Sequence, residues 1–484
     1  MATVKLFNHH FRTPFIFLLL SEYVLLFLAV YVGVFFRFET TIWQPLSESL
    51  QFLPLKSSIF ALVMVLSMLA MGQYQAPGPK GEHFFPYIFT RVAISLVLGT
   101  FALLVVYYAF PEMLIGRGVF GYAVTSAVVG LSIYRSLLYK MIDGRALRKK
   151  ILVIGAGKLA SSLIDLEVDL SKAKFESKRI LTPKYASYVV HGFVHISDEK
   201  QMIPDKYLVN PEDDLVEYCQ EYEIEEIVLA IDDRRKTMPV DDLLDCKLSN
   251  IGVSEFISFW EKEKGMLRLD MLNPSWLIFS DGCRQGDVSS FFTRIFDILV
   301  SLVILILMFP ILVITAFLIL IENGLKGPVF YRQKRVGLNG KVFQLLKFRS
   351  MIVNAEKAGE AQWATEKDNR ITLIGRFIRK VRIDELPQIL NIFKGDMSLV
   401  GPRPERPEFV SKLEEKISFF STRHRVKPGL AGWAQLKYPY GASDDDAYKK
   451  LEYDLYYVKN HTILMDALIL LQTVEVILLG KGAR

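Results

Sequence analysis

The sequence Arg382-Ile383-Asp384-Glu385-Leu386-Pro387-Gln388 sets two neighbouring carboxylates beside an arginine and just before a proline. Two further polar stretches follow it closely, Gly395-Asp396-Met397-Ser398 and Gly401-Pro402-Arg403-Pro404-Glu405. Carboxylates among cations suit phosphoryl chemistry, because one can attack phosphorus, another can hold a metal ion, and arginines can neutralise phosphate oxygens. An apolar segment interrupted by a proline lies upstream, which suggests that one phosphate donor or acceptor sits in a membrane.

That apolar segment, residues 298–321, contains 24 uncharged residues and is long enough to cross a bilayer. The chain that follows has one nearby acid, Glu322, and seven basic residues: Lys326, Arg332, Lys334, Arg335, Lys341, Lys347 and Arg349. Both flanks therefore favour the cytoplasmic side, which a single crossing cannot satisfy. Pro310 lies mid-segment, where its ring and missing N–H would bend a helix. We predict a re-entrant hairpin over about residues 291–321, with a kinked fifth span as the alternative.

Four earlier stretches also have the length and apolarity of membrane-spanning helices, at residues 15–36, 53–71, 92–110 and 119–138. Basic residues flank the start, the second connection and the exit of this region, so both ends of a four-span domain, residues 1–147, are predicted to be cytoplasmic. Glu22 lies inside the first stretch. It is either a proton site or a carboxyl that faces other helices, and the second interpretation is simpler.

The composition agrees with a membrane protein, since 51% of the 484 residues are apolar and the mean hydropathy is +0.27. The net charge of +6 is unremarkable for such a protein, and no nucleic-acid partner is expected. Three scattered cysteines, Cys219, Cys246 and Cys283, form neither a disulfide framework nor a zinc motif, which fits a reducing compartment.

The middle region begins with a short apolar strand that runs into Gly155-Ala156-Gly157 and then a helical pattern, the opening of a dinucleotide-binding fold. We predict a Rossmann-like α/β domain over residues 148–265. The glycine fingerprint is incomplete, and no acidic residue stands convincingly at the end of the expected second strand. A degenerate structural or regulatory domain is therefore favoured over a working cofactor site.

The segment before the carboxylates is predicted to be a basic amphipathic helix around residues 375–383. Its apolar stripe consists of Ile374, Phe377, Ile378 and Val381, and its basic residues are Arg376, Arg379, Lys380 and Arg382. A helix in the headgroup plane explains this pattern, as does a soluble helix packed on its own core. The neighbouring hairpin and carboxylates favour the membrane interface.

Asp384 and Glu385 should do different jobs, because adjacent side chains on a helix diverge by about 100°. Pro387 suits the first turn of a new helix over residues 387–393, whose positive end would attract phosphate. We predict that Asp384 is a nucleophile on phosphorus and that Glu385 is a metal ligand or proton acceptor. Mg²⁺ is the expected ion, since hard oxygen ligands suit it. Between two prolines, Arg403 would be held ready for a diphosphate.

Several motifs together resemble the bacterial sugar transferase family, the polyprenyl-phosphate hexose-1-phosphate transferases or monotopic phosphoglycosyl transferases. Besides those already quoted, they include 327–333, 347–351, 370–372, 428–435 and 453–457. The match covers about residues 285–484. The four-span bundle and the degenerate α/β domain resemble the large members, and the tail resembles the exopolysaccharide (PEP-CTERM-associated) branch.

The resemblance implies transfer of a sugar 1-phosphate from a UDP-sugar to undecaprenyl phosphate, with release of UMP, at the start of exopolysaccharide assembly. It implies a ping-pong route in which Asp384 carries the phosphosugar, while Glu385 is associated with Mg²⁺ and Asp384 is a further candidate metal ligand. Further residues match family positions near phosphate or the active site: Arg379, Arg403, Lys347, Arg349 and Arg332 for phosphate, and Asp454 as a carboxylate and candidate metal ligand. A monotopic catalytic domain, residues 266–484, would face the cytoplasm from the bacterial inner membrane, in a homodimer.

Two departures from the family pattern stand out. Phe309 precedes Pro310 where the family often has a serine, and Arg382 replaces a small polar residue. Two other functions remain open. A membrane-anchored nucleotide-sugar dehydratase would need a complete glycine fingerprint and leaves the last 200 or so residues unexplained, whereas a catalytically dead assembly scaffold would not need intact carboxylates. The sequence does not identify the sugar.

Overall fold

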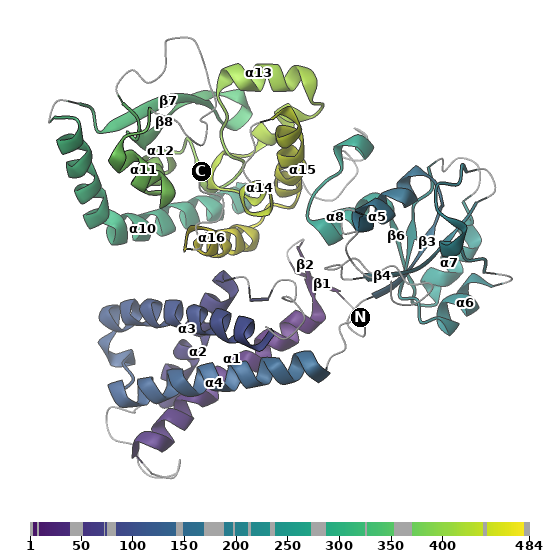
Figure 1. Ribbon diagram of the computed structural model, residues 1–484, viewed down its shortest axis with the longest axis horizontal. Coiled ribbons are helices and arrows are strands. Elements are labelled where there is room, and N and C mark those ends of the chain that lie inside the picture. The colour runs from purple at the N-terminus through teal and green to yellow at the C-terminus, as the bar shows by residue number, and fades with distance from the viewer. Residues whose placement is uncertain are drawn as a thin grey trace. The chain divides into compact units, whose positions relative to one another are not determined.

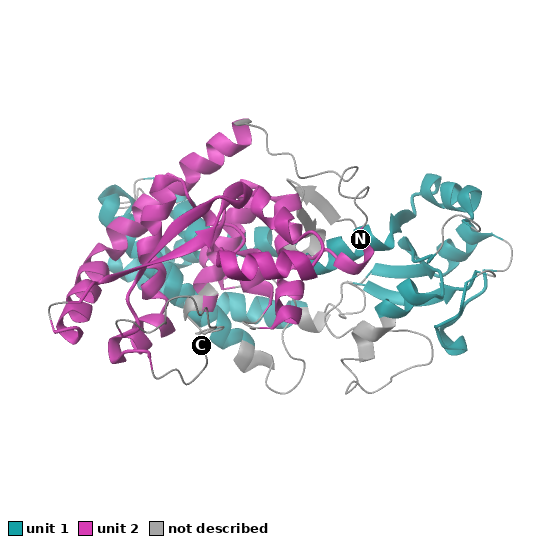
Figure 2. Ribbon diagram, turned by 90° about the horizontal axis from the view of Figure 1, so that it is seen from above, with its two compact units in different colours: residues 1–4, 10–65, 74–265 teal, residues 5–9, 66–73, 266–484 magenta. Residues whose placement is uncertain are grey.

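The computed structural model describes residues 3–6, 9–38, 52–71, 73–74, 84–141, 149–168, 188–196, 199–211, 214–232, 238–272, 287–324, 327–352, 370–438 and 443–478. The chain divides into two compact units, coloured separately in Figure 2. The first comprises residues 1–4, 10–65 and 74–265, and the second comprises residues 5–9, 66–73 and 266–484. Each is considered by itself.

The first unit contains most of the predicted N-terminal helical region (Figure 1). After a short hairpin of β1 (Thr3–Leu6) and β2 (His9–Arg12), the helices of this region are α1 (Thr13–Phe38), α2 (Leu53–Ala70), α3 (Phe84–Ala109), the short η2 (Pro111–Met113) and α4 (Arg117–Met141). Among the described residues, α1, α2 and α3 are long and apolar enough to cross a membrane. The fourth expected span is helical as predicted, but α4 does not reach the same apolarity. Its crossing stays a prediction.

Close packing and one buried ion pair join α4 to the rest of the bundle. Gly33 on α1 lies so close to the backbone of α4 that an added Cβ would stand 2.6 Å from the carbonyl oxygen of Val119. Glu22 on α1 accepts a bidentate pair of hydrogen bonds from Arg135 on α4, at 2.5 and 2.9 Å, and a third from the Tyr74 hydroxyl at 2.6 Å. Glu22 therefore faces the protein and is paired there, as the simpler interpretation of the sequence holds.

The second half of this unit is a parallel α/β domain. Strands β3 (Lys149–Ile154), β4 (Tyr188–Val194), β5 (Glu226–Leu229) and β6 (Gly252–Glu255) form one sheet in the order β4-β3-β5-β6, with every pairing parallel. The helices are α5 (Lys158–Val168), α6 (Leu215–Glu221), α7 (Val240–Leu248) and α8 (Phe256–Lys264), besides the short η3 (Asp205–Tyr207). The alternation of strand and helix predicted from the sequence is thus present.

The glycine turn between β3 and α5 is closed by carboxylates of the chain itself. Gly155 has a φ of +122°, and a side chain there would collide with the backbone of Ala230. Glu199 accepts a hydrogen bond from the backbone N–H of Ala156 at 2.7 Å, and Asp232 accepts from those of Lys158 and Leu159 at 2.8 and 2.9 Å. In a dinucleotide site, N–H groups of this turn and helix end face a pyrophosphate. Here carboxylates use them instead.

The second unit holds the carboxylate pair and is built around two small sheets. Strands β7 (Phe330–Val336) and β8 (Val342–Phe348) form an antiparallel hairpin across η5 (Leu338–Gly340), and β9 (Ser398–Val400) pairs in parallel with β10 (Gly429–Ala431). The surrounding elements are η4 (Leu269–Met271), α10 (Asp287–Glu322), α11 (Leu373–Lys380), η6 (Ile383–Gln388), α12 (Ile389–Lys394), α13 (Pro407–Lys416), η7 (Phe420–Arg425), α14 (Trp433–Lys437), α15 (Asp444–Asn460) and α16 (Ile463–Leu478).

Helix α10 contains the predicted hairpin segment. It is helical through Pro310, and Figure 1 draws it as two arms that meet at a bend. It is also long and apolar enough to cross a membrane. If its 36 residues were straight, they would measure about 54 Å.

Both arms of α10 contact the same compact unit. On the first arm, Asp297 accepts hydrogen bonds from the Ser398 hydroxyl and the Leu399 N–H, each at 3.0 Å. On the second arm, Glu322 accepts from the N–H of Ile374 at 3.1 Å, and Ile319 is buried in a cluster with α11 and β8. The two ends of this apolar helix are therefore attached to one and the same folded body.

Candidate active site

The carboxylate pair lies in the first turn of η6, directly after α11. Helix α11 ends earlier than expected, at Lys380, and Arg382 has a φ of +61° in the left-handed region. Non-glycine residues adopt this conformation rarely, because Cβ crowds the backbone there. The new helical turn also begins at Ile383 rather than at Pro387, so both acids lie inside it instead of before it. This corrects the predicted bounds of both helices.

Glu385 is surrounded by cations from three different elements. Its Oε1 atom lies 2.5 Å from Nη2 of Arg403, 3.2 Å from Nζ of Lys347 on β8, and 3.8 Å from Nη1 of Arg382. Burial alone would raise the pKa of Glu385, but Arg403 and Lys347 outweigh it and hold that pKa well below the usual value. Glu385 is therefore a permanent anion that organises the cations around it.

Asp384 has the opposite electrostatic setting. It is buried, and its Oδ1 atom has no hydrogen-bond partner among the described residues. Burial raises the pKa of Asp384, the charge of Glu385 raises it further, and Lys347, Arg379 and Arg403 oppose the rise. Pairs of carboxyls whose pKa values are driven apart are typical of sites with separate chemical roles. The carboxyl of Asp384, which makes no hydrogen bond or ion pair with the described residues, is the candidate group for reaction or coordination.

The loop that carries Arg403 is fixed by its own backbone. Four consecutive carbonyl groups each accept a hydrogen bond: that of Pro402 from the Gly429 N–H, of Arg403 from Nη2 of Arg423, of Pro404 from Nη1 of Arg335, and of Glu405 from the Val336 N–H, all between 2.9 and 3.0 Å. Such a loop loses little entropy when its guanidinium binds an anion. These contacts restrain the loop in addition to the two prolines that flank Arg403.

Asp454 lies behind this loop. Its Oδ2 atom is 2.8 Å from Nη2 of Arg423, and the two side chains are only 4% and 7% exposed. Because the same guanidinium nitrogen donates to the carbonyl of Arg403, Asp454 acts on the site through Arg423. Within the parts of the chain that the structure describes, no group of three or more His, Cys, Asp or Glu side chains is arranged to hold a metal ion.

The remaining predicted phosphate-binding residues are placed differently from one another. Arg379 on α11 and Lys347 are close enough to act on the charge of Asp384. Arg349 instead donates through Nε to the carbonyl of Pro328 at 3.1 Å. Arg332 pairs with Leu346 in the hairpin, so it lies exposed on the face opposite Lys347. The position of Arg332 does not support a role at the carboxylates.

Three residues that position the site were not predicted. Asn391 on α12 donates to the carbonyl of Gln344 at 2.7 Å and accepts from the N–H of Leu346 at 3.0 Å, which fixes the strand that carries Lys347. Arg423 fixes the Arg403 loop, and Asp297 attaches the membrane helix to β9. Only a charge inside an apolar segment could have drawn attention to Asp297. Neither Arg423 nor Asn391 stands in a recognisable motif.

The fold and the site together define a membrane-associated protein with a buried carboxylate pair in a cluster of cations, an arrangement suited to phosphate groups. The sequence pattern described as bacterial sugar transferase matches residues 288–480. The chain belongs to the bacterial sugar transferase family.

Individual relatives agree with this assignment. A UDP-N-acetylgalactosamine-undecaprenyl-phosphate N-acetylgalactosaminephosphotransferase of Aeromonas hydrophila is 42% identical over 242 residues, which is 50% of this chain and 56% of that protein. A UDP-glucose:undecaprenyl-phosphate glucose-1-phosphate transferase of Klebsiella pneumoniae is 39% identical over 40% of this chain and 42% of its own length. The protein named uncharacterized sugar transferase EpsL of Bacillus subtilis is 40% identical over 39% of this chain and 88% of its own length. The chain thus spans about half the length of the first two relatives.

Proposed function

We propose that this protein is a phosphoglycosyl transferase that moves a sugar 1-phosphate from a UDP-sugar to undecaprenyl phosphate and releases UMP. The observation that carries the proposal is the buried carboxyl of Asp384, whose Oδ1 atom has no hydrogen-bond partner among the described residues, next to an anion, Glu385, that gathers Arg403 and Lys347. The relatives' names, which include undecaprenyl-phosphate transferases for N-acetylgalactosamine and glucose, support the same reaction.

In the first step a carboxylate oxygen of Asp384 attacks the phosphorus that carries the sugar. The bond from that phosphorus to the bridging oxygen breaks, and UMP leaves with the oxygen and its electron pair. Arg403, Lys347 and Arg379 stabilise the negative charge on the phosphate oxygens. In the second step an oxygen of undecaprenyl phosphate attacks the same phosphorus. The carboxylate of Asp384 is released, and the lipid diphosphate sugar is formed.

Mg²⁺ is part of the proposal, because it is held in proteins by one or two carboxylates together with substrate phosphates. The buried, unpartnered Oδ1 of Asp384 fits such an ion, and Glu385 would join it where the incoming phosphates draw Arg403 or Lys347 away. When bound, the ion would neutralise diphosphate charge. Asp454 is already paired with Arg423, so we propose no direct metal contact for it.

The α/β domain is proposed to be a Rossmann-like structural or regulatory domain rather than a cofactor site. Glu199 and Asp232 already use the N–H groups that a pyrophosphate would need, and their charge would repel one. This observation counts against the nucleotide-sugar dehydratase alternative, which requires a bound dinucleotide. The well-organised carboxylate pair and loop count against a dead scaffold.

The function is tested by offering a panel of UDP-sugars with undecaprenyl phosphate and measuring released UMP. We expect UMP release with at least one UDP-sugar. Sustained turnover should require undecaprenyl phosphate. Absence of UMP release with galactose, glucose and N-acetylhexosamine donors alike would contradict the proposal. The same panel would identify the sugar and show whether an exopolysaccharide precursor is made.

We further propose that α10 is a re-entrant hairpin and that the catalytic unit faces the cytoplasm of the bacterial inner membrane, in a homodimer. The attachment of both arms to one folded unit supports the hairpin, since the ends of a spanning helix would stand on opposite sides of the membrane. Cysteines placed at positions 290 and 340 are expected to react with a membrane-impermeant maleimide only when the cytoplasmic face is accessible. Labelling of the two positions from opposite sides would show a full crossing instead.

A further inference from the structure

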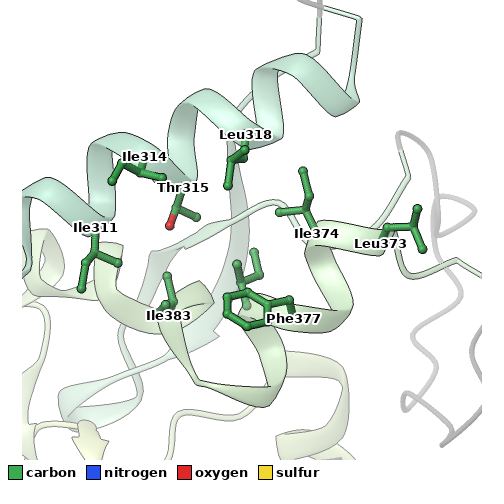
Figure 3. Close-up of a pocket in the computed structure, with 9 residues that line it drawn as sticks. Ile311, Ile314, Thr315, Leu318, Leu373, Ile374, Phe377 and Ile383 are labelled. Carbon is green, nitrogen blue, oxygen red and sulfur yellow. The ribbon is translucent and has the colours of Figure 1, made fainter.

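An apolar groove lies between the second arm of α10 and helix α11 (Figure 3). It has a volume of about 380 Å³. Its walls include Ile311, Ile314 and Leu318 from α10 and Ile374 and Phe377 from α11, and Figure 3 shows these side chains pointing toward one another across it. Phe377 is 63% exposed at its edge. An apolar groove of this size is in the range of small-ligand sites.

The groove lies beside the proposed active site. Ile383 forms part of its wall, and the next residue in the chain is Asp384, whose buried Oδ1 atom has no hydrogen-bond partner among the described residues. Arg379, on the same helix as Phe377, acts on the charge of Asp384. An apolar groove beside a cluster of cations is complementary to a molecule that has an apolar tail and an anionic head.

We propose that this groove binds the first isoprene units of the lipid phosphate acceptor and thereby sets its phosphate opposite Asp384. The groove wall and the reacting carboxylate stand on neighbouring residues, Ile383 and Asp384. A lipid whose phosphate is joined directly to its hydrocarbon chain suits such a short connection. In a phospholipid, glycerol and two ester groups stand between phosphate and tail. The inference rests on the proposed function and adds to it a site for the acceptor.

The groove is tested by filling it. In Ile314→Trp the larger side chain would occupy the space, whereas Ile306→Trp is a matched control, because Ile306 is an equally apolar, exposed residue of α10 outside the groove. Two reactions are compared: exchange of labelled UMP into UDP-sugar without lipid, which reports the first step alone, and turnover with undecaprenyl phosphate. We expect Ile314→Trp to raise the KM for the lipid roughly tenfold or more while exchange stays within about twofold of wild type. Ile306→Trp should change neither.

The outcomes separate the groove from the function. Normal exchange with an unchanged lipid KM in Ile314→Trp overturns the groove alone. Missing exchange in the wild-type protein overturns the proposed two-step function, and the groove with it. Since a tryptophan in α10 could perturb folding, a second measurement uses the unaltered protein. A polyprenyl phosphate probe with a photoreactive first isoprene unit is expected to label residues 311–318 or 373–383, and undecaprenyl phosphate should prevent this. Labelling there by a phospholipid probe that undecaprenyl phosphate does not displace would show bulk lipid in the groove and overturn the inference.

Discussion

Asp384→Asn is expected to abolish both sugar-phosphate transfer and formation of any covalent phosphosugar adduct, with activity reduced by about 10³-fold or more. The amide is nearly the same size as the carboxylate but is neutral and a poor nucleophile. Burial makes the charged form of Asp384 unfavourable in the folded protein. Removal of this charge should therefore not lower the free energy of unfolding. The measurements are UMP release, mass spectrometry of the intact protein after incubation with UDP-sugar, and thermal unfolding.

Glu385→Gln is the control variant for Asp384→Asn, because it changes the neighbouring acid and keeps the proposed nucleophile. The change leaves Asp384 in place but removes the anion that holds Arg403 at 2.5 Å and Lys347 at 3.2 Å. We expect slower turnover, but the covalent phosphosugar adduct should still form. Adduct formation, and not activity alone, would then distinguish the role of Glu385 from that of Asp384. An adduct that persists in Asp384→Asn would exclude this residue as the nucleophile.

The pH dependence of the first step follows from the same electrostatics. Attack requires ionised Asp384, and burial raises the pKa of that carboxyl above its ordinary value. Lipid-free UMP exchange should therefore decline on the acid side at a higher pH than an exposed aspartate would give. Replacement of Arg403 by glutamine should move this decline to a still higher pH, because a charge that opposes the rise is lost.

The residues of the candidate site could largely be proposed from local sequence, and the residues that support them could not. Asp384, Glu385 and Arg403 stand in compact motifs whose residue types indicate phosphate chemistry directly. The apolar segment with Pro310 could also be recognised, because its length and its flanking charges are properties of one continuous stretch of sequence. The C-terminal end of α11 was predicted a few residues too late, because Arg382 adopts a left-handed conformation that no sequence pattern predicts.

What the sequence could not provide is contact between distant segments. Arg423 and Asp454 are 31 positions apart, and both act on a loop that starts at Gly401. Asn391 fixes β8 through hydrogen bonds to Gln344 and Leu346, which no spacing rule relates to it. Glu199 and Asp232 close the glycine turn from other loops. Each depends on tertiary packing that composition and periodicity do not encode.

Asp454→Asn is expected to be the more damaging of two changes that break the buried Asp454–Arg423 pair. It leaves a guanidinium that cannot lose its proton, and unpairing a buried charge in this way costs about 3–5 kcal/mol of folding free energy. Arg423→Met leaves a carboxyl that can take up a proton instead. Burial already raises the pKa of Asp454 to about 6, even with the arginine opposing that rise. As a surface comparison, Lys416→Met breaks the exposed pair with Asp444 and should leave the melting temperature unchanged.

The stability of Arg423→Met should depend on pH in a definite direction. Without the cation, the pKa of Asp454 in the folded protein rises further, while in the unfolded chain it returns to its ordinary value near 3.8. Between these two values the folded state holds a proton that the unfolded state has released, so stability falls as the pH is raised. Thermal unfolding from pH 5 to pH 8 measures this trend. A flat profile would mean that Asp454 keeps its charge by other contacts.

Arg423→Lys separates a role in folding from a role in positioning Arg403. A lysine ammonium can still pair with Asp454, but as a compact charge it cannot reproduce the planar guanidinium that serves both Asp454 and the carbonyl of Arg403. We therefore expect wild-type stability with a clearly lowered kcat, because Arg403 would no longer be held against Glu385. Loss of both stability and activity would point to a purely structural pair. Full activity in a stable Arg423→Lys protein would mean that the other three carbonyl contacts suffice to hold the loop, and that Asp454 has no influence on catalysis through it.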